Sequence, residues 1–283
     1  MSRAADGRRR QTGTQNVEQM ANLTIEKLTI TYTMARTGQA LTAVQDASFG
    51  VAEGEFVAII GPSGCGKTSI LNAVAGIQPI SAGQIAVGGQ EVRGPGRDRA
   101  MVFQSPALLP WRSMLGNVAY GLELQGMRRS EAHARARAQI DLVGLTGFEE
   151  SYPHELSGGM QQRANLARAL AVAPQVLLFD EPLAALDAQS RELMQMELQR
   201  VWMERRVTAL FVTHQIDEAI LLADRVLVMS AAPGRMAANI IVPLPRPRRQ
   251  LDRSAPAFVE LERDIRRVLA DGAAAHLLRS AEG

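Results

Sequence analysis

The residues best suited to chemistry form a glycine-rich loop, Gly61-Pro62-Ser63-Gly64-Cys65-Gly66-Lys67-Thr68, which follows an apolar run and precedes Ser69. Glycines at this spacing let backbone N–H groups turn inward around phosphate oxygens, and a helix after the loop adds its positive N-terminal end. The lysine of such a loop reaches the terminal phosphates of a nucleotide, and the threonine hydroxyl is placed to ligate Mg²⁺. The spacing is not the G-x-G-x-x-G of a dinucleotide turn. We therefore expect a nucleoside triphosphate and its magnesium ion to bind here.

Four polar residues at the ends of strand-like runs extend this candidate site. Asp180 and Glu181 follow the apolar residues 176–179, at the end where an α/β sheet normally presents its site. We expect Asp180 to hold Mg²⁺ through water and Glu181 to polarise an attacking water molecule. His214 is placed to donate a hydrogen bond to the γ-phosphate, and Gln104 to contact metal or water. Taken singly, each also fits a solvated turn or a structural role.

The single cysteine, Cys65, lies inside the glycine-rich loop. It has no second cysteine with which to form an internal disulfide, and no His or Cys cluster has metal-ligand spacing, which favours a reducing, cytoplasmic setting. An adduct on its thiol would sit where the phosphates must go. We therefore expect bulky thiol reagents to inhibit the protein and bound ATP to slow labelling. The alternative is that Cys65 is a small buried filler.

The elements that must position these residues follow an α/β pattern. Strand-like segments, which alternate with helical stretches, cover residues 23–30, 55–60, 175–180 and 208–213. The last three are nearly continuous apolar runs, which is typical of a parallel sheet covered on both faces. Between positions 105 and 152 the pattern becomes helical, most clearly at 130–145. We therefore expect one α/β core with a helical insertion between its strands.

The two ends of the chain differ from this core. The first twenty residues are rich in arginine but lack an apolar segment, so we expect a loose basic tail and no signal peptide. Short β-like runs return over residues 225–243, and a proline-rich linker follows at 243–248. Beyond it, we expect a helix that Ser254 caps and Gly272 ends. One face of that helix carries Phe258, Leu261, Ile265 and Leu269.

Composition restricts the class of protein. The chain has 283 residues, 46% hydrophobic and 21% charged, which describes a folded protein and excludes a disordered or fibrous one. No run approaches the roughly 18 consecutive apolar residues that a membrane-spanning helix needs. The net charge is only +2 and the arginines are scattered or lie in the tails, so charge alone does not decide for or against nucleic acid.

A second anion-binding helix start follows at Leu156-Ser157-Gly158-Gly159-Met160-Gln161-Gln162-Arg163. Two such ends make little sense in one site, but they make sense if two chains face each other and each supplies half of two sites. At this point the sequence resembles the ATP-binding subunits of ABC transporters, over about residues 23–248. The motifs of that family occur in its order: Tyr32, the phosphate loop, Gln104, Ser157, Asp180-Glu181, Ala185-Leu186-Asp187 and His214.

The resemblance implies a P-loop NTPase (RecA-like) core with antiparallel β elements and an inserted α-helical subdomain. An ATPase domain would span residues 21–248, with the helical subdomain at about 105–170, between a disordered basic tail (1–20) and a C-terminal helical tail (249–283). It also implies that Tyr32 stacks on adenine and that Asp187 lies at the dimer seam. Ser157, Gly158 and Gly159 would grip the γ-phosphate of ATP held by the partner chain. Two positions depart from the family. Thr68-Ser69 replaces the commoner Ser-Thr, but Thr68 still offers a hydroxyl to Mg²⁺. Ala185 replaces a frequent serine, which removes at most one hydrogen bond across the dimer.

The family includes transporter subunits and also soluble ATPases that act on nucleic acid or ribosomes. The soluble relatives usually carry tandem units, long coiled coils or zinc-bearing insertions, whereas this chain has one unit, one cysteine and no sustained heptads. A mere nucleotide-binding regulator would need neither Glu181 nor His214. The apolar, Pro-kinked residues 105–111, which end in Trp111, fit a groove for a partner's helix, with ordinary packing as the alternative.

Three segments, Trp111-Arg112, Pro233-Gly234-Arg235 and residues 244–248, are similar to those of nitrate, sulfonate and taurine importers, and thiamine-precursor importers are similar too. The resemblance implies a homodimer of ATPase subunits at the cytoplasmic face of the inner membrane. It would join transmembrane permease subunits, depend indirectly on a solute-binding protein, and bind no nucleic acid. The cargo would be a small anionic solute, but the ATPase never touches it, so these residues do not name it.

Overall fold

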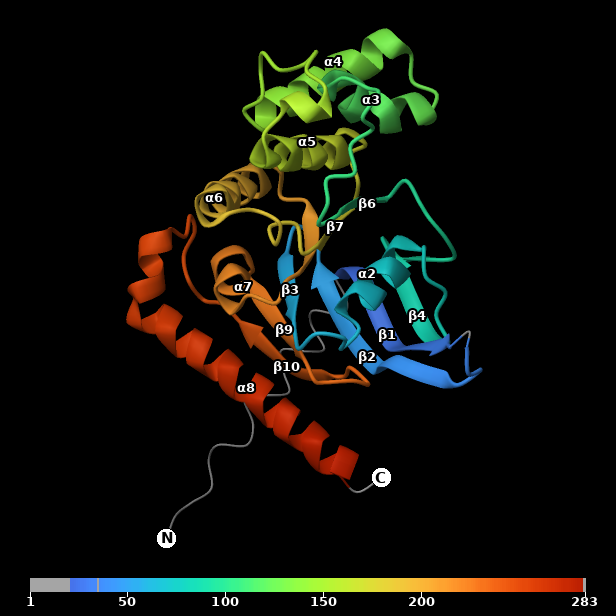
Figure 1. Cartoon of the computed structure of the whole chain (residues 1–283), viewed down its shortest axis with the longest axis vertical. Coiled ribbons are helices and arrows are strands. Elements are labelled where there is room, and N and C mark those ends of the chain that lie inside the picture. Colours follow the sequence, from blue (N-terminus) through green and yellow to red (C-terminus); the bar gives the residue numbers. More distant parts are fainter. Residues whose placement is uncertain (1–20, 35, 282–283) are drawn as a thin grey trace.

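The computed structural model describes residues 21–34 and 36–281, with side chains described for residues 22–34 and 36–272. The basic tail predicted at residues 1–20 lies outside the described residues. Figure 1 shows two β-sheets at the centre, a group of helices at one end, and the long helix α8 along the side of the core. In the part of the chain that is described, no helix is both long and apolar enough to cross a membrane.

The larger sheet has six strands in the order β10-β9-β3-β8-β7-β6. Five of them are parallel, and only the edge strand β10 is antiparallel to its neighbour. The strands expected at residues 55–60, 175–180 and 208–213 are confirmed to within one residue at each end. The strands are β3 (Phe56–Ile60), β6 (Arg99–Val102), β7 (Val176–Asp180), β8 (Thr208–Val212), β9 (Arg225–Met229) and β10 (Met236–Ile241).

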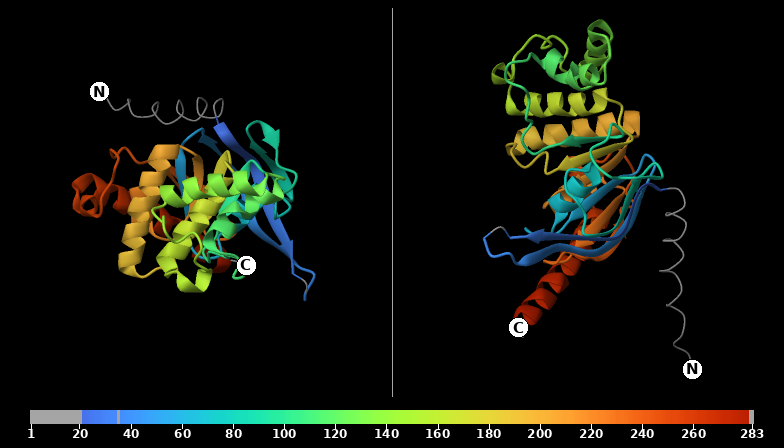
Figure 2. Two further views of the ribbon diagram at one scale, coloured as in Figure 1. Left: turned by 90° about the horizontal axis from the view of Figure 1, so that it is seen from above. Right: turned by 90° about the vertical axis from the view of Figure 1, so that its right-hand side faces the viewer.

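A smaller antiparallel sheet has the order β2-β1-β4-β5. The strand expected at residues 23–30 is the middle of β1, and the sequence did not locate the others. Figure 2 shows the β1–β2 hairpin projecting beyond the rest of the molecule. Helix α2 (Lys67–Ala75) packs in the same buried cluster as this sheet. The strands are β1 (Ala21–Thr33), β2 (Ala40–Ala52), β4 (Ala82–Val87) and β5 (Gln90–Glu91).

The central strands β3, β8 and β9 of the larger sheet are buried on both faces, as their continuous apolar runs predict. Along β3, Val57 and Ile59 point into the cluster with α2 and the small sheet, whereas Phe56 and Ala58 point into the opposite cluster. That opposite face is covered by α6 (Ala188–Arg205), α7 (Ile216–Leu222) and α8 (Pro256–Ala281). The ring of Phe56 lies 5.6 Å from that of Trp202 on α6, edge to face. Each such fully buried side chain contributes about 1.5–3 kcal/mol.

The helical insertion lies between β6 and β7. It contains α3 (Met114–Leu124), α4 (Arg129–Leu142), the 3₁₀ turn η1 (Pro153–Glu155) and α5 (Gly158–Ala171). Figure 2 shows these helices as layers above the sheets, with α5 next to α6. A helical insertion in one α/β core is thus confirmed, and residues 105–113 form no regular element within it.

The C-terminal segment differs in detail from its prediction. Phe258 and Ile265 are buried, as expected for the apolar face of α8. Ser254, however, ends a separate 3₁₀ turn, η2 (Gln250–Ser254), where its hydroxyl donates to the Leu251 carbonyl and does not cap α8. Gly272 lies inside α8, which continues to Ala281. A glycine inside a helix costs only about 1 kcal/mol, which the packing of the preceding turns outweighs.

The proline-rich linker at residues 243–248 has no regular structure, but it is firmly anchored to the core. The buried guanidinium of Arg248 donates to the carbonyls of Ile220 and Ala223 at the end of α7, at 2.7 and 2.6 Å. Arg246 pairs with Asp224 at 2.8 Å. The Arg248 bonds satisfy carbonyls that the end of a helix leaves without partners.

Candidate active site

The phosphate loop connects β3 to α2 and is shaped by its glycines. Gly64 and Gly66 have φ values of +78° and +93°, in the left-handed region that glycine tolerates best. A Cβ on Gly66 would lie 2.5 Å from Cγ2 of Val44 on β2, so only glycine fits there. Among the described residues, no side chain caps the start of α2 at Lys67. The first N–H groups of α2 therefore remain available to an anion.

Lys67 and Cys65 both lie inside the loop. The Lys67 ammonium group donates to the carbonyls of Gly61 and Pro62, at 2.9 and 3.0 Å. Cys65 is fully buried, and burial raises the pKa of its thiol. The reactive thiolate is therefore scarce and shielded. This burial favours the alternative, that Cys65 is a small buried filler, over its modification by bulky thiol reagents.

The loop faces a cavity of about 460 Å³. Tyr32 on β1 borders it, and its hydroxyl donates to the hydroxyl of Ser69, at 2.9 Å. The structure thus brings together predicted site residues from β1, the loop and the end of β7. The lining residues are Tyr32, Leu41, Ala43, Ser63, Gly64, Gly66, Lys67, Thr68, Ser69 and Glu181.

Polar side chains meet where β7 and β8 end side by side. The Thr68 hydroxyl donates to Asp180 at 2.9 Å, and burial raises the pKa of that carboxyl group, against the opposing effect of this bond. Glu181 adopts a left-handed backbone conformation with φ +45°. Its Oε2 lies 2.9 Å from Nδ1 of His214. Asp180, Glu181 and His214, three of the four polar residues that were expected at strand ends, therefore have hydrogen-bond partners at one edge of the sheet.

Gln104 follows β6, which runs parallel to β7 with Val102 paired to Phe179, so its backbone reaches the same edge of the sheet. It is exposed beyond the end of β6. Within the described part of the chain it forms no hydrogen bond to Thr68, Asp180 or Glu181. Its contact with metal or water stays a prediction.

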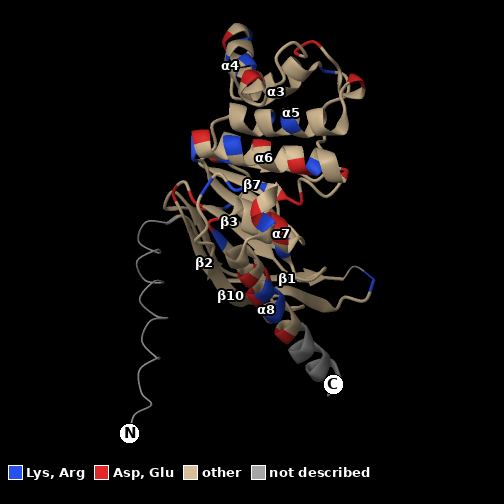
Figure 3. Ribbon diagram, turned by 90° about the vertical axis from the view of Figure 1, so that its left-hand side faces the viewer, with Lys and Arg blue, Asp and Glu red and all other residues tan. Residues whose placement is uncertain are grey.

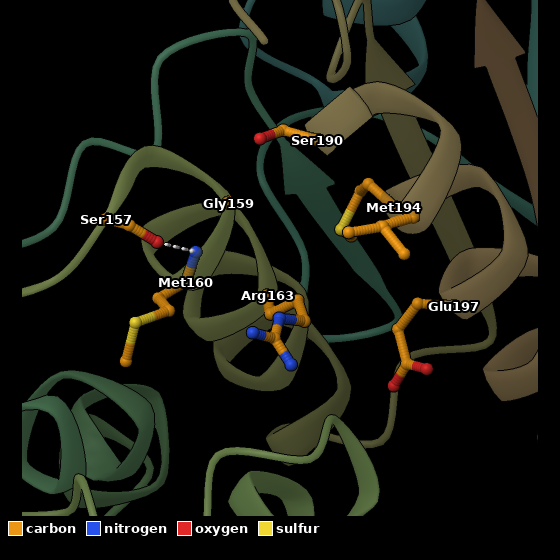
Figure 4. Close-up of a pocket in the computed structure, with 8 residues that line it drawn as sticks. Ser157, Gly159, Met160, Arg163, Ser190, Met194 and Glu197 are labelled. Carbon is orange, nitrogen blue, oxygen red and sulfur yellow. Dashed lines mark hydrogen bonds between the residues drawn. The ribbon is translucent and has the colours of Figure 1, made fainter. Parts of the chain in front are cut away.

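Ser157 caps α5, its hydroxyl accepting a hydrogen bond from the Met160 N–H at 3.3 Å. With Gly159 it borders a separate hollow of about 280 Å³ between α5 and α6, shown in Figure 4. The adjacent Gly158 is exposed at the first position of α5. This hollow shares no lining residue with the cavity at the phosphate loop. The two helix ends that were predicted to bind anions therefore border separate hollows within one chain.

Asp187 caps α6 by accepting from the Ser190 N–H at 2.9 Å, and bonds to Ser190 lower the pKa of its carboxyl group.

The sequence analysis missed Arg191, the residue that holds the segment before Asp187. Arg191, one helical turn after Asp187, donates to the carbonyls of Leu186 and Leu183, at 2.9 and 3.4 Å. The sequence signal for this role is an arginine four residues after Asp187, because residues four apart on a helix lie on the same face.

Comparisons with known proteins agree with this geometry. The ABC transporter family matches residues 44–184, from β2 through the phosphate loop and α5 to the segment after Glu181. An uncharacterized ABC transporter ATP-binding protein of Methanocaldococcus jannaschii is 46% identical over 234 residues, covering 83% of this chain and 86% of that protein. The chain belongs to the ABC transporter ATP-binding proteins. As a member of that family it is an ATPase that binds and hydrolyses ATP, as the sequence analysis expected.

Other relatives of this ABC ATPase are more specific. The taurine import ATP-binding protein TauB of Rhizobium johnstonii is 45% identical over 240 residues, covering 83% of this chain and 92% of that protein. A dimeric ATP-binding cassette bound to ADP and Pi superimposes with a TM-score of 0.68 at 29% identity, over 78% of this chain and 98% of that one. A part of the cbiONQ ABC transporter complex from Clostridium perfringens, cbiO1, gives the same TM-score at 26% identity, over 77% and 88%. The predicted core with antiparallel β elements and a helical subdomain is confirmed.

Proposed function

We propose that two copies of this ABC ATPase work as a pair and power the uptake of a small anionic solute through a separate permease. The separation of Ser157 from the phosphate loop within one chain carries this proposal. A second copy would bring its Ser157, Gly158 and Gly159 to the γ-phosphate of ATP bound at the first. Asp187 would lie at the seam between the copies. The dimeric form of a similar cassette supports this arrangement.

Thr68 and Asp180 fit a magnesium ion beside the triphosphate. Mg²⁺ prefers oxygen ligands and usually keeps several waters, so one or two protein oxygens together with phosphates are enough. The two side chains offer such oxygens 2.9 Å apart. Among the residues that the structure describes, no cluster of three or more His, Cys, Asp or Glu could hold a metal by itself. When bound, the ion neutralises charge on the phosphates.

The remaining residues act on the nucleotide and on the attacking water. Lys67 would exchange its two carbonyl partners for phosphate oxygens, and Tyr32 would stack on the adenine ring. Glu181 would polarise the water, while His214, at hydrogen-bond distance from Glu181, would donate to the γ-phosphate. Gln104, which follows β6 next to the end of β7, would contact the metal or the water.

The permease would dock at Trp111. This side chain is 71% exposed and borders a hollow of about 720 Å³ on the helical insertion. The segment that presents it is held by Asn117, which is fully buried. The Asn117 amide accepts from the Leu109 N–H at 2.7 Å and donates to the Leu109 and Arg112 carbonyls at 3.1 and 3.0 Å. An exposed tryptophan on a rigid segment suits an interface anchor.

The similarity to taurine import proteins supports an anionic solute of the sulfonate type. Such a system would place this chain peripherally at the cytoplasmic face of the inner membrane. A solute-binding protein would deliver the cargo to the permease and act on the ATPase indirectly. Nucleic acid would have no part in this cycle.

The experiment that tests this function compares Trp111→Asp with Leu251→Asp, a control on η2 where the side chain is 83% exposed. Each is assembled with the permease and the solute-binding protein of the transport system. We expect Trp111→Asp to abolish solute uptake and solute-stimulated hydrolysis, while hydrolysis by the isolated subunit stays within about twofold. The control should retain both. Stimulation of the isolated subunit by nucleic acid, or uptake unaffected by Trp111→Asp, would contradict the proposal.

A further inference from the structure

Thr213 holds the backbone on both sides of His214. Its buried hydroxyl accepts a hydrogen bond from the Gln215 N–H at 3.0 Å. The same hydroxyl donates to Oε2 of Glu218, one turn further on in α7, at 2.7 Å. The His214 side chain itself is half exposed, and its described hydrogen-bond partner is Glu181. The direction of the imidazole therefore depends on this turn.

Glu218 is itself held from α6 and the C-terminal segment. Its residue is only 3% exposed, and its Oε1 accepts from Nε2 of Gln195 at 3.3 Å. Oε1 of the same Gln195 amide accepts from Gln250 and Arg253 of η2, at 2.6 and 3.2 Å. Because the Arg253 guanidinium can only donate, it requires the amide oxygen and so fixes the orientation in which Nε2 faces Glu218. The carboxylate thus has a defined donor on each oxygen.

The same carboxylate reaches the segment between Glu181 and Asp187. Its Oε1 lies 3.9 Å from Nε of Arg191, the residue that binds the carbonyls of Leu183 and Leu186. Figure 3 shows α6, α7 and α8 one after another on this side of the molecule, with acidic residues on each. One buried carboxylate therefore connects two loops of the active site.

We propose that Glu218 is a positioning residue, which fixes His214 through Thr213 and fixes the segment before Asp187 through Arg191. Neither Glu218 nor Thr213 borders the cavity that faces the phosphate loop, so their effect on catalysis is indirect. A buried carboxylate with this set of partners also stabilises the fold, and the test must separate the two effects. The inference rests on the proposed role of His214.

The test compares two threonines at opposite ends of one strand. Thr213 follows β8, and Thr208 begins it; both are buried and both hydroxyls make two hydrogen bonds. Valine has the same shape but no hydroxyl, so Thr213→Val and Thr208→Val remove equivalent groups. We expect both to lower Tm, but only Thr213→Val to lower kcat, by about tenfold or more, with ATP affinity within about twofold of the parent.

Three further variants complete the design. Thr213→Ser restores the hydroxyl and should restore kcat. Combining Thr213→Val with Glu218→Ala should lower kcat no further than the more severe single change, since the two act as one unit. His214→Ala tests the role on which the inference rests. If His214→Ala loses activity while Thr213→Val resembles Thr208→Val, the positioning role is wrong; if His214→Ala keeps full kcat, the proposed role of His214 fails instead.

Discussion

Nδ1 of His214 lies 2.9 Å from Oε2 of Glu181, across the ends of the neighbouring strands β7 and β8. Glu181, directly after Asp180, has a left-handed backbone conformation with φ +45°. Adjacent acids thus face different partners, a threonine hydroxyl for Asp180 and an imidazole for Glu181. This division fits metal binding at one carboxylate and activation of water at the other.

Glu181→Gln should bind ATP with nearly parental affinity but hydrolyse it about 100-fold more slowly or worse, because the charge that activates water is lost. With ATP and Mg²⁺, size-exclusion chromatography should show the variant as a dimer. Glu204→Gln, a change of an exposed glutamate on α6, is the matched control and should turn over normally. A Glu181→Gln protein that stays monomeric and keeps normal turnover would show that Glu181 has another role.

Cys65 should resist thiol reagents in the folded protein. The side chain is fully buried and its pKa is raised by burial, so a maleimide should label native protein at least about 100-fold more slowly than unfolded protein. Mass spectrometry over a time course measures both rates. Cys65→Ala should retain ATP binding. Rapid labelling of native protein, slowed by ATP, would instead mean that the loop opens readily in solution.

Arg248→Met should destabilise the fold by about 2–4 kcal/mol, because several carbonyls near the end of α7 lose a buried charged donor. Burial lowers the pKa of Arg248 to about 10, so the guanidinium is still charged near neutral pH. The control is Arg93→Met, whose side chain is 83% exposed in its ion pair with Glu91. Urea denaturation of both proteins measures the difference, and equal midpoints would refute the anchoring role.

Glu218 should make stability depend on pH in a specific direction. Burial raises the pKa of its carboxyl group above the ordinary value of 4.5. In the window between that value and the raised pKa, the folded state binds more protons than the unfolded state, so stability falls as pH rises. Relative to the parent, Glu218→Gln should therefore gain unfolding free energy through this window and level off above it. Parallel curves from calorimetry would show that the carboxyl group is not perturbed.

The sequence predicted those parts of the site whose geometry is set by residues close together in the chain. The loop from Gly61 to Thr68 carries its own geometry, since glycine spacing, lysine and hydroxyl are all local. Asp180, Glu181 and His214 could be placed because carboxyl ends of parallel strands meet at one edge of a sheet. The apolar face of α8 was likewise visible as a helical period, including the buried Phe258 and Ile265.

What the sequence left out depends on contacts between distant residues. The β2 strand contains Gln45 and Asp46 and lacks a continuous apolar run, so it was overlooked although Val44 packs against Gly66. Burial of Cys65 follows from packing around the loop, which the motif does not encode. Gly272 was expected to end α8, but glycine weakens a helix without determining its end.

The separation of Ser157 from Lys67 has a genetic consequence under the proposed pairing. Each site of the proposed dimer uses Lys67 of one copy and Ser157 of the other. In a mixed dimer, a substitution of Lys67 in one copy and of Ser157 in the other therefore affects the same site. The second site keeps both of its intact halves. Placed together on one copy, the same two substitutions damage both sites. Alleles that fail alone would therefore complement each other in trans, although neither copy carries an intact set of motifs.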